Sequence, residues 1–471
     1  MRRTKIVATI GPASADREVL KKMIEQGVDV CRINFSHGSH EDHHQVIETV
    51  RSIDAELGVH TAILADLQGP KLRVGKMKDG GVPLKKDQEL IITTEECEGD
   101  DKRVFMTYQE FPHDVKVGER VLMDDGKLIM EVVSTDKKRE VKVRVMQDGT
   151  LKSNKGVNLP NTTISLPSLT EKDLEDLEFV LQQPIDYIGL SFVRSARDII
   201  ELRHLISKAG KMHKVVAKIE KPEALDDIDA IIRETDALMV ARGDLGVEIP
   251  LQNVPLIQKD LIKKSLRHAK PIIVATQMME SMIENVSPTR AEVNDVANAV
   301  LDGADAVMLS GETSVGNHPI MVIETMRKIV EQIETADQIY FHETEPHHNN
   351  ERFITDSICY NAARLAKRVS AKAIVTMTHS GYTAYKISSQ RPNSLVIVFT
   401  ANRRILTALS LVWGVKCFYY DKMVSTDHTI ADSKYILRKS GFIQEGDMII
   451  NIASMPIEEK GQSNMIKLSK A

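Results

Sequence analysis

Buried-strand and amphipathic-helix patterns alternate along the first 70 residues of the chain. TKIVATIG, VDVCRINFS and TAILADLQG are apolar and rich in β-branched residues, as expected of strands that are buried on both faces. DREVLKKMIEQG and HHQVIETVRSIDAELG lie between them, repeat apolar positions at helical spacing and end in glycine. This order predicts parallel βαβ units.

The pattern changes between Gly75 and Pro167. Short β-rich runs such as ELIITT, RVFMTY and LIMEVVS are separated by turn residues, and no helical repeat interrupts them. We therefore expect an all-β insertion in this part of the chain. Pro70 and Pro167 lie near its two ends, where we expect hinges.

The α/β alternation then resumes. IDYIGLSFV, KVVAKIE, ALMVARGD, PIIVATQ and ADAVMLSGE predict five more strands, with helical repeats between and after them. Eight β-then-α units predict an α/β fold of the (β/α)8 TIM-barrel type. HETEPHHNNE has the composition of a linker, and the runs beyond it predict a further α/β domain with a mainly parallel sheet.

The predicted organisation is therefore a barrel that is interrupted once and followed by a second α/β domain. Residues 1–70 and 169–341 would form the barrel, residues 71–168 an inserted β-barrel lid, and residues 342–471 the C-terminal domain.

Composition narrows the functional classes. With 471 residues and a formal net charge of -5, the chain has no basic excess that would indicate a nucleic-acid surface. It has no apolar run of the roughly 20 residues that cross a bilayer and no pattern of a secretory signal. Its four cysteines lie far apart without a C-x-x-C pair, which indicates a reducing, cytoplasmic compartment.

Polar residues follow the apolar strands at the ends where a barrel of this kind carries its chemistry. Strand ends are also simply where a chain leaves the core, and this would explain one or two positions. It explains less well a set that contains carboxylates, a lysine and several arginines. The set comprises Arg32, Asn34, Ser36, His37, Asp66, Lys71, Arg73, Lys218, Glu220, Arg242, Gly243, Asp244, Thr276, Gln277, Ser310 and Glu312.

Two carboxylates in this set are candidate metal ligands. Glu220 and Asp244 end neighbouring predicted strands, so both could point into one mouth. Such a pair suits Mg²⁺, which takes few protein ligands and keeps several waters; the alternative is a pair of surface or ion-paired acids. Lys218 projects from the same strand face as Glu220, where it could stabilise charge on a transferring phosphoryl group.

Phosphate binding is indicated by side chains rather than by a glycine-rich loop. Arg32 and Arg73 can make bidentate contacts to phosphate oxygens. The ARGDLG stretch predicts a strand-to-loop turn, whose backbone N–H groups, together with Thr276, could hold a small carboxylate. The chain contains neither G-x-x-x-x-G-K-[ST] nor G-x-G-x-x-G, so a nucleotide would be bound at the barrel mouth.

The longest motifs carry a family resemblance. CRINFSHG, ADLQGPKLR, NKGVNLP, AKIEK, MVARGDLGVEIP, ATQMMESM and PTRAEVNDVANAVLDGADAVMLSGET, together with the layout of the whole chain, closely resemble pyruvate kinase. The resemblance implies a cytoplasmic glycolytic kinase, allosteric and homotetrameric, that transfers the phosphoryl group of phosphoenolpyruvate to ADP. It also implies a lid that closes over the mouth.

The resemblance assigns roles to individual residues. Lys218 would stabilise the transferring phosphoryl group, and Glu220 and Asp244 would hold Mg²⁺, which Mn²⁺ could replace. Thr276 would lie near the enolate carbon that gains a proton. The other implied contacts are Arg32, Gly243, Asp244 and Thr276 with the substrate, and Asn34, Ser36, His37, Arg73 and Lys155 with the nucleotide.

The sequence departs from the best-known family pattern beside the third strand. Many relatives have D-T-K-G-P-E here and bind K⁺, whereas this chain has Asp66, Leu67 and Lys71 at the first, second and last positions. Asn34 and Ser36 remain. The family has a K⁺-independent branch of this kind, so our hypothesis is that the Lys71 ammonium takes the place of K⁺. Val315 stands where many relatives have a lysine near the nucleotide.

A turn in the C-terminal domain is a candidate effector site. In relatives the loop that matches Thr378, His379, Ser380, Gly381 and Thr383 binds sugar-phosphate activators. An ordinary strand-to-helix turn with capping hydroxyls is the alternative. Tyr382 stands where relatives often have arginine, so AMP, a sugar monophosphate and fructose 1,6-bisphosphate all remain candidate effectors.

Two other functions are compatible with parts of the pattern. A Mg²⁺-dependent lyase or aldolase could stabilise pyruvate enolate on a similar barrel without a nucleotide. A phosphoenolpyruvate or sugar-phosphate sensor could have lost turnover. Arg73, Lys155 and the lid argue against the lyase. The sensor is disfavoured by the four intact candidate catalytic and metal-binding residues, Lys218, Glu220, Asp244 and Thr276.

Overall fold

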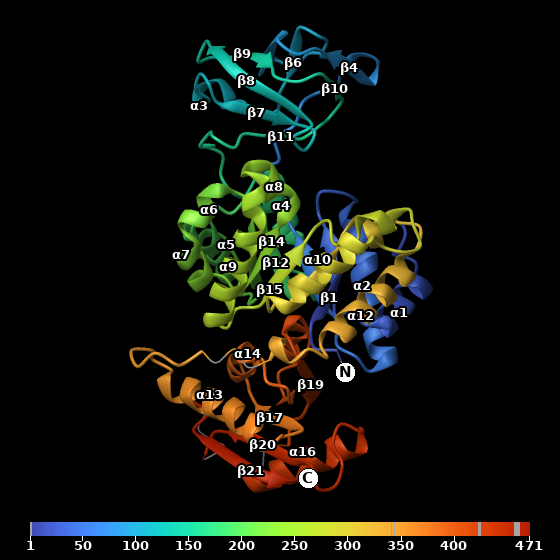
Figure 1. Cartoon of the computed structure of the whole chain (residues 1–471), viewed down its shortest axis with the longest axis vertical. Helices are drawn as coiled ribbons and strands as arrows, with labels where there is room; N and C mark the ends of the chain where they lie inside the picture. Colours follow the sequence, from blue (N-terminus) through green and yellow to red (C-terminus); the bar gives the residue numbers. More distant parts are fainter. Residues whose placement is uncertain (1, 341, 343, 423–424, 456–461) are drawn as a thin grey trace.

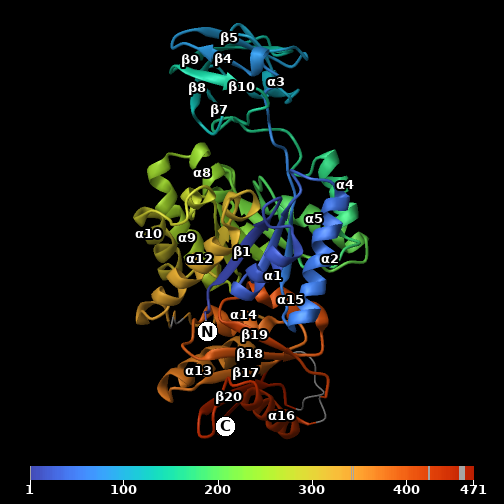
Figure 2. The ribbon, with the colours of Figure 1, turned by 90° about the vertical axis from the view of Figure 1, so that its right-hand side faces the viewer.

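The computed structural model describes residues 2–340, 342, 344–422, 425–455 and 462–471. Eight parallel strands close into a barrel in the order β1-β16-β15-β14-β13-β12-β3-β2, which confirms the predicted TIM barrel (Figures 1 and 2). Nearly all their residues are buried, which explains their continuous apolar runs. The strands are β1 (Lys5–Ile10), β2 (Val30–Asn34), β3 (Ala62–Asp66), β12 (Tyr187–Leu190), β13 (Lys214–Ile219), β14 (Ala237–Ala241), β15 (Ile272–Ala275) and β16 (Ala306–Leu309).

Helices surround the barrel, and several of them begin at side-chain caps. Ser39, Thr170 and Thr289 each form a capping box with the acidic residue three positions later, which satisfies the first free N–H groups of the helix. The helices are α1 (Arg17–Gln26), α2 (His40–Leu57), α4 (Glu171–Val180), α5 (Ala196–Lys208), α6 (Pro222–Asp226), α7 (Ile228–Glu234), α8 (Arg242–Glu248), α9 (Val254–Arg267), α10 (Arg290–Leu301), α11 (Gly311–Ser314) and α12 (Pro319–Ile333).

The β domain leaves the barrel after β3 and lies beyond the carboxyl ends of the barrel strands (Figure 1). Its strands form a six-stranded sheet in the order β11-β7-β8-β9-β5-β6 and a two-stranded sheet of β10 and β4. A four-residue helix, α3 (Phe111–Asp114), was not predicted. The strands are β4 (Gly81–Leu84), β5 (Glu89–Thr93), β6 (Arg103–Phe105), β7 (Arg120–Met123), β8 (Leu128–Thr135), β9 (Glu140–Val145), β10 (Gly149–Lys152) and β11 (Val157–Asn158).

The C-terminal domain packs against the opposite end of the barrel (Figure 2). Its sheet has the order β19-β18-β17-β20-β21, in which only β21 is antiparallel, as the predicted mainly parallel sheet requires. Ala408 and Leu411 pack in one cluster with inward-facing barrel residues and so close this end. The elements are α13 (Phe353–Arg368), β17 (Ala373–Met377), α14 (Tyr382–Ser389), β18 (Leu395–Thr400), α15 (Arg403–Ala408), β19 (Val415–Tyr419), α16 (Thr426–Lys439), β20 (Met448–Ala453) and β21 (Met465–Lys470).

Across the described part of the chain, no helix is both long and apolar enough to span a membrane. The cysteines are free, and three of the four are buried.

Candidate active site

Lys218 lies at the centre of a buried polar cluster at the carboxyl ends of β3, β12 and β13. Its ammonium is 3.1 Å from both Asp66 Oδ1 and Glu220 Oε1 and donates to Ser191 Oγ at 2.7 Å. Burial alone would lower the pKa of Lys218, but the charges of Asp66 and Glu220 outweigh it and hold the pKa above its ordinary value. The lysine is therefore a fixed positive charge at neutral pH.

Two residues that directly follow β12, the fourth barrel strand, orient the side chains of this cluster. Ser191, directly after β12, donates to the carbonyl of Leu67 at 2.7 Å and accepts from Lys218. The N–H of Phe192, whose φ is +53°, donates to Glu220 Oε2 at 2.8 Å. The prediction omitted both residues, although the strand-end rule applied to the fourth strand would have found them.

Arg32 joins the same cluster from β2. Its guanidinium contacts Asp66 Oδ2 at 2.6 Å and donates to Thr9 Oγ1 at 2.9 Å. Burial would raise the pKa of Asp66, but Lys218 and Arg32 outweigh it and lower the pKa, so this carboxylate stays ionised. Asp66 therefore positions two cations side by side at the barrel mouth.

Glu220 and Asp244 have the properties of a two-carboxylate cation site. Burial raises the pKa of Glu220, Lys218 opposes this, and the charge of nearby Asp244 raises the pKa further. A divalent cation between the two would relieve that repulsion, so this donor set fits Mg²⁺, for which two carboxylates and several waters are typical. The described residues contain no group of three or more His, Cys, Asp or Glu side chains that could hold a metal ion.

Thr276 and Gly243 come together at the ends of β15 and β14. The Gly243 N–H donates to Thr276 Oγ1 at 2.7 Å, and this hydroxyl donates to the Ala275 carbonyl at 2.6 Å. The predicted turn at Gly243 is instead the first turn of the seven-residue helix α8. Its buried Leu245 and Glu248 anchor this turn to the barrel.

Arg242 braces the Thr276 loop. Thr276 and Gln277 both have positive φ angles, +69° and +55°, which are unfavourable for residues with a Cβ. The Arg242 guanidinium donates to the carbonyl of Thr276 at 2.6 Å and contacts Asp295 Oδ1 at 2.7 Å. Arg242 was noted at a strand end, but its bracing role could not be predicted because its partners lie on other elements.

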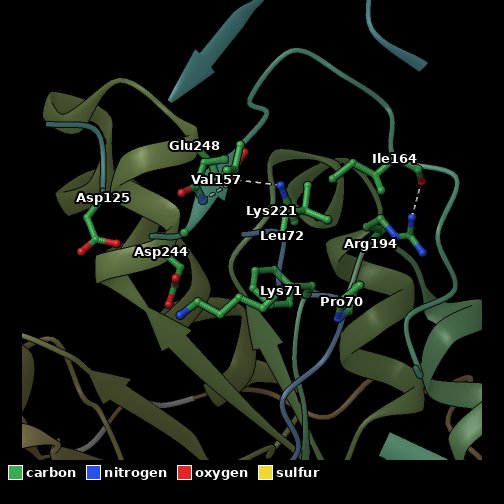
Figure 3. Close-up of a pocket in the computed structure, with 13 residues that line it drawn as sticks. Pro70, Lys71, Leu72, Asp125, Val157, Ile164, Arg194, Lys221, Asp244 and Glu248 are labelled. Atoms are coloured by element: carbon green, nitrogen blue, oxygen red, sulfur yellow. Dashed lines mark hydrogen bonds and ion pairs between the residues drawn. The ribbon is translucent and has the colours of Figure 1, made fainter. Parts of the chain in front are cut away.

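A pocket lies between the β domain and the barrel mouth (Figure 3). Asp244 and Lys71 both line it, and the Lys71 side chain extends toward Asp244. Glu248, one turn further along α8 than Asp244, also lines the pocket, and its Oε1 accepts from Lys221 Nζ at 2.7 Å and from Asn158 Nδ2 of β11 at 2.8 Å. This contact joins the β domain to α8.

The predicted nucleotide residues lie in two separate groups. Arg73 and Lys155 are in the β domain, where Arg73 donates to the Asn154 carbonyl at 3.0 Å and Lys155 pairs with Asp124 at 2.8 Å. Asn34, Ser36 and His37 form a turn after β2, in which Asn34 Oδ1 accepts from the Ser36 N–H at 3.1 Å. One group therefore belongs to the β domain and the other to the carboxyl end of β2 in the barrel.

Comparison with known proteins identifies the family of this chain. The model of the pyruvate kinase barrel domain matches residues 1–323, and the model of the pyruvate kinase alpha/beta domain matches residues 356–469. The chain belongs to the pyruvate kinase family. Its members are transferases, and the resemblance found in the sequence motifs is thereby confirmed.

Individual pyruvate kinases match over nearly the whole chain. The enzyme of Corynebacterium glutamicum is 44% identical over 465 residues, covering 99% of this chain and 97% of that protein. That of Staphylococcus aureus (strain MRSA252) is 42% identical over 469 residues, covering 99% of this chain and 80% of that protein. The crystal structure of a pyruvate kinase from Cryptosporidium parvum superposes with a TM-score of 0.93 at 34% identity and covers 100% of this chain and 96% of its own.

The positions that depart from the common pyruvate kinase pattern differ in burial. Leu67 is buried beneath the Lys218 cluster, where its carbonyl accepts from Ser191. Lys71 is exposed at the pocket. Val315, which replaces a lysine of many pyruvate kinases, is an exposed apolar residue.

The candidate effector loop is a tight turn between β17 and α14. Thr378 Oγ1 accepts from the N–H of Gly381, whose φ is +84°, and Thr383 Oγ1 contacts Ser463 Oγ at 3.2 Å. The His379 carbonyl accepts from Asn402. Tyr382 turns away from the loop and donates to Asp356 Oδ1 at 2.7 Å. The loop thus has internal capping bonds of the kind that the alternative interpretation predicts.

Proposed function

We propose that this pyruvate kinase family member transfers the phosphoryl group of phosphoenolpyruvate to ADP, giving pyruvate and ATP. It would be a phosphotransferase of the alcohol-group acceptor class that acts in glycolysis in the cytoplasm. The observation that carries the proposal is the buried Lys218 ammonium, which Asp66, Glu220 and Ser191 hold in one place. A fixed cation stabilises a transferring phosphoryl group without reorganisation.

The substrate would bind with its phosphate against Arg32 and Lys218. Both cations are oriented by Asp66, so they keep their geometry before the substrate arrives. The carboxylate of the substrate would bind beside Gly243, Asp244 and Thr276. Such alignment supplies much of the catalysis in phosphoryl transfer.

Glu220 and Asp244 would hold Mg²⁺, or Mn²⁺ in its place. The bound ion would neutralise negative charge on the phosphate and enolate oxygens. After transfer the enolate carbon would gain a proton from a water that the Thr276 hydroxyl holds in place, and bulk solvent would return the proton to that water. To hold the water, the hydroxyl would exchange its hydrogen bond to the Ala275 carbonyl for one to the water.

The nucleotide would lie between the barrel and the β domain. Asn34, Ser36 and His37 would contact it from the barrel, and Arg73 and Lys155 from a lid of residues 71–168. The Asn158–Glu248 hydrogen bond supports a closing role for this domain. Closure excludes water that would otherwise take the phosphoryl group.

We further propose that K⁺ is not required. Lys71 would supply the monovalent charge beside Asn34, Ser36 and Asp66, and buried Leu67 removes a hydroxyl ligand that a K⁺ site would use. The Lys71 side chain reaches toward Asp244 at the same mouth, which supports an electrostatic role there.

Regulation and assembly follow the family pattern in this proposal. The C-terminal domain, residues 342–471, would act on the barrel of residues 1–70 and 169–341, and the chain would form a homotetramer. A phosphorylated effector would bind at Thr378, His379, Ser380, Gly381 and Thr383.

The test is pyruvate formation from phosphoenolpyruvate with Mg²⁺, with and without ADP. We expect pyruvate and ATP in equal amounts and no pyruvate without ADP. Pyruvate that forms equally well without ADP would support the lyase instead, and binding without turnover would support the sensor.

A further inference from the structure

A cleft of about 530 Å³ lies where the lower end of the barrel meets α15 of the C-terminal domain. Figure 2 shows α15 below α2 and the barrel, at the end opposite the β domain. This volume falls within the roughly 300–1,000 Å³ of small-molecule sites, which often lie between domains. The cleft lies apart from the Lys218 cluster and does not include residues 378–383.

The cleft is strongly cationic. Five lysine and arginine side chains line it but only one carboxylate, that of Asp186. Both carboxylate oxygens of Asp186 already have partners. Oδ2 pairs with Arg51 at 2.9 Å and accepts from the Ile63 N–H, and Oδ1 accepts from the Thr407 hydroxyl. The excess positive charge is therefore not neutralised from within the cleft.

Some of these cations already have partners. Lys214 lies 3.5 Å from Asp236 Oδ1, and Arg403 stacks 4.5 Å from the centre of the Tyr419 ring. Lys211 and Arg404 make no side-chain hydrogen bond or ion pair within the described ranges of the chain. One comes from the barrel and the other from α15, so the two free cations border the cleft from different domains.

His213 adds an unused polar atom beside them. Its Nδ1 is buried and has no hydrogen-bond partner among the described residues. Burial lowers the pKa of His213, and the charges of Lys211 and Arg404 lower it further, so the ring is neutral at pH 7. The ring already makes a hydrogen bond to the backbone of Gln183, which uses the single N–H of a neutral ring. The free Nδ1 therefore donates to an anion in the protonated ring, which the negative charge of a bound phosphate would favour.

We propose that Lys211, His213 and Arg404 form a binding site for a small phosphate-bearing molecule at the barrel–C-terminal domain interface. Two cations and an N–H donor complement the oxygens of a phosphate. The apolar wall of Leu181, Ile405 and Ala408 leaves room for the carbon skeleton that carries it. The site goes beyond the proposed function.

The cleft is placed to influence the Lys218 cluster. β12 begins directly after Asp186 and ends directly before Ser191 and Phe192, the partners of Lys218 and Glu220. β13 begins at Lys214 and carries Lys218 itself. The Tyr187 hydroxyl, at the start of β12, donates to the Ala408 carbonyl of α15 at 2.7 Å. A ligand that bridges the two domains should therefore change the KM for phosphoenolpyruvate.

The test is the number of radiolabelled orthophosphate ions bound per chain in equilibrium dialysis. We compare the full-length chain with Lys211→Met/Arg404→Met and with the control Lys208→Met/Arg438→Met, which removes equal charge from exposed residues outside the cleft. The wild type and the control should bind one more phosphate than the cleft variant. Equal numbers in all three would overturn the site. This readout does not depend on turnover, so it can fail independently of the proposed activity.

Two further measurements complete the test. The ring ¹⁵N resonances of His213 should shift on adding phosphate to the wild-type chain, and unshifted resonances would count against the site even if the double variant failed to fold. A sugar monophosphate and a nucleoside monophosphate are then tested for displacing the label. Displacement by one of them identifies the carbon skeleton, and displacement by neither identifies orthophosphate as the ligand. Finally, the KM for phosphoenolpyruvate is measured with and without phosphate in the wild type and in the cleft variant. An equal effect of phosphate on both proteins would overturn the link between the cleft and the active site.

Discussion

At the scale of single residues, the candidate active site consists of side chains that are held by partners from distant parts of the chain. Asp66 orients Arg32 and Lys218, and Arg242 braces a loop whose backbone is otherwise unfavourable. The strand-end rule predicted these candidates because a barrel exposes them at one edge. It could not predict which of them would pair, since pairing depends on side-chain directions across strands.

Arg242→Met should reduce kcat through misplacement of Thr276. The two positive-φ residues lose their brace, and a shift of the hydroxyl by about 1 Å can cost roughly 100-fold in rate. Asp295→Asn is the matched control, because it removes the salt bridge while the bond to the Thr276 carbonyl remains. Steady-state kinetics of both variants test this, and equal losses would show that the brace is not the cause.

Lys71 should make the enzyme indifferent to K⁺. In buffers free of Na⁺ and K⁺ we expect wild-type turnover to stay near its full rate, because the ammonium is always present. Lys71→Glu should lose at least about tenfold, roughly 1.4 kcal/mol, and regain rate on adding K⁺. A wild-type rate that falls and is restored by K⁺ would reject the hypothesis.

At the scale of elements, long periodic segments were predicted well and short ones were not. The eight barrel strands follow their apolar runs because both faces are buried. Helix α8 was missed because its two glycines favour a turn, and α3 because four residues are too few for a helical repeat. Both helices are held by buried side chains, which a local pattern does not report.

The contact between β11 and α8 should matter for closure of the β domain. Asn158→Ala removes a hydrogen bond to the buried Glu248 carboxylate, of a kind that contributes about 1.5–3 kcal/mol. We expect a lower kcat/KM for phosphoenolpyruvate and some pyruvate formation by hydrolysis in the absence of ADP. Asn161→Ala, at an exposed position close by, is the control and should behave as the wild type. Unchanged kinetics in Asn158→Ala would show that this bond does not help to close the domain.

At the scale of the whole molecule, the two smaller domains sit at opposite ends of the barrel (Figure 1). The switch between periodic patterns in the sequence predicted a barrel, an insertion and a C-terminal α/β domain. The contacts between domains could not be predicted, because they join residues that are far apart in the sequence. Arg391 is one example: it is buried and pairs with Asp305 at 3.0 Å beneath Trp413.

Arg391→Met should weaken the interface between the barrel and the C-terminal domain. Removal of one partner of a buried ion pair leaves the other charge uncompensated, at a cost of about 3–5 kcal/mol. We expect a clearly lower midpoint of thermal unfolding, while Arg368→Met, at an exposed helix end, should leave it unchanged. A midpoint that is equal in both variants would show that the pair contributes little.

The central claim is that the Lys218 ammonium stabilises the phosphoryl group during transfer. Its most direct test is the single-turnover rate of phosphoryl transfer in Lys218→Met, measured together with the Kd for phosphoenolpyruvate. We predict a loss of several orders of magnitude in the rate, with substrate still bound through Arg32. A variant that transfers the phosphoryl group at the wild-type rate would contradict the mechanism.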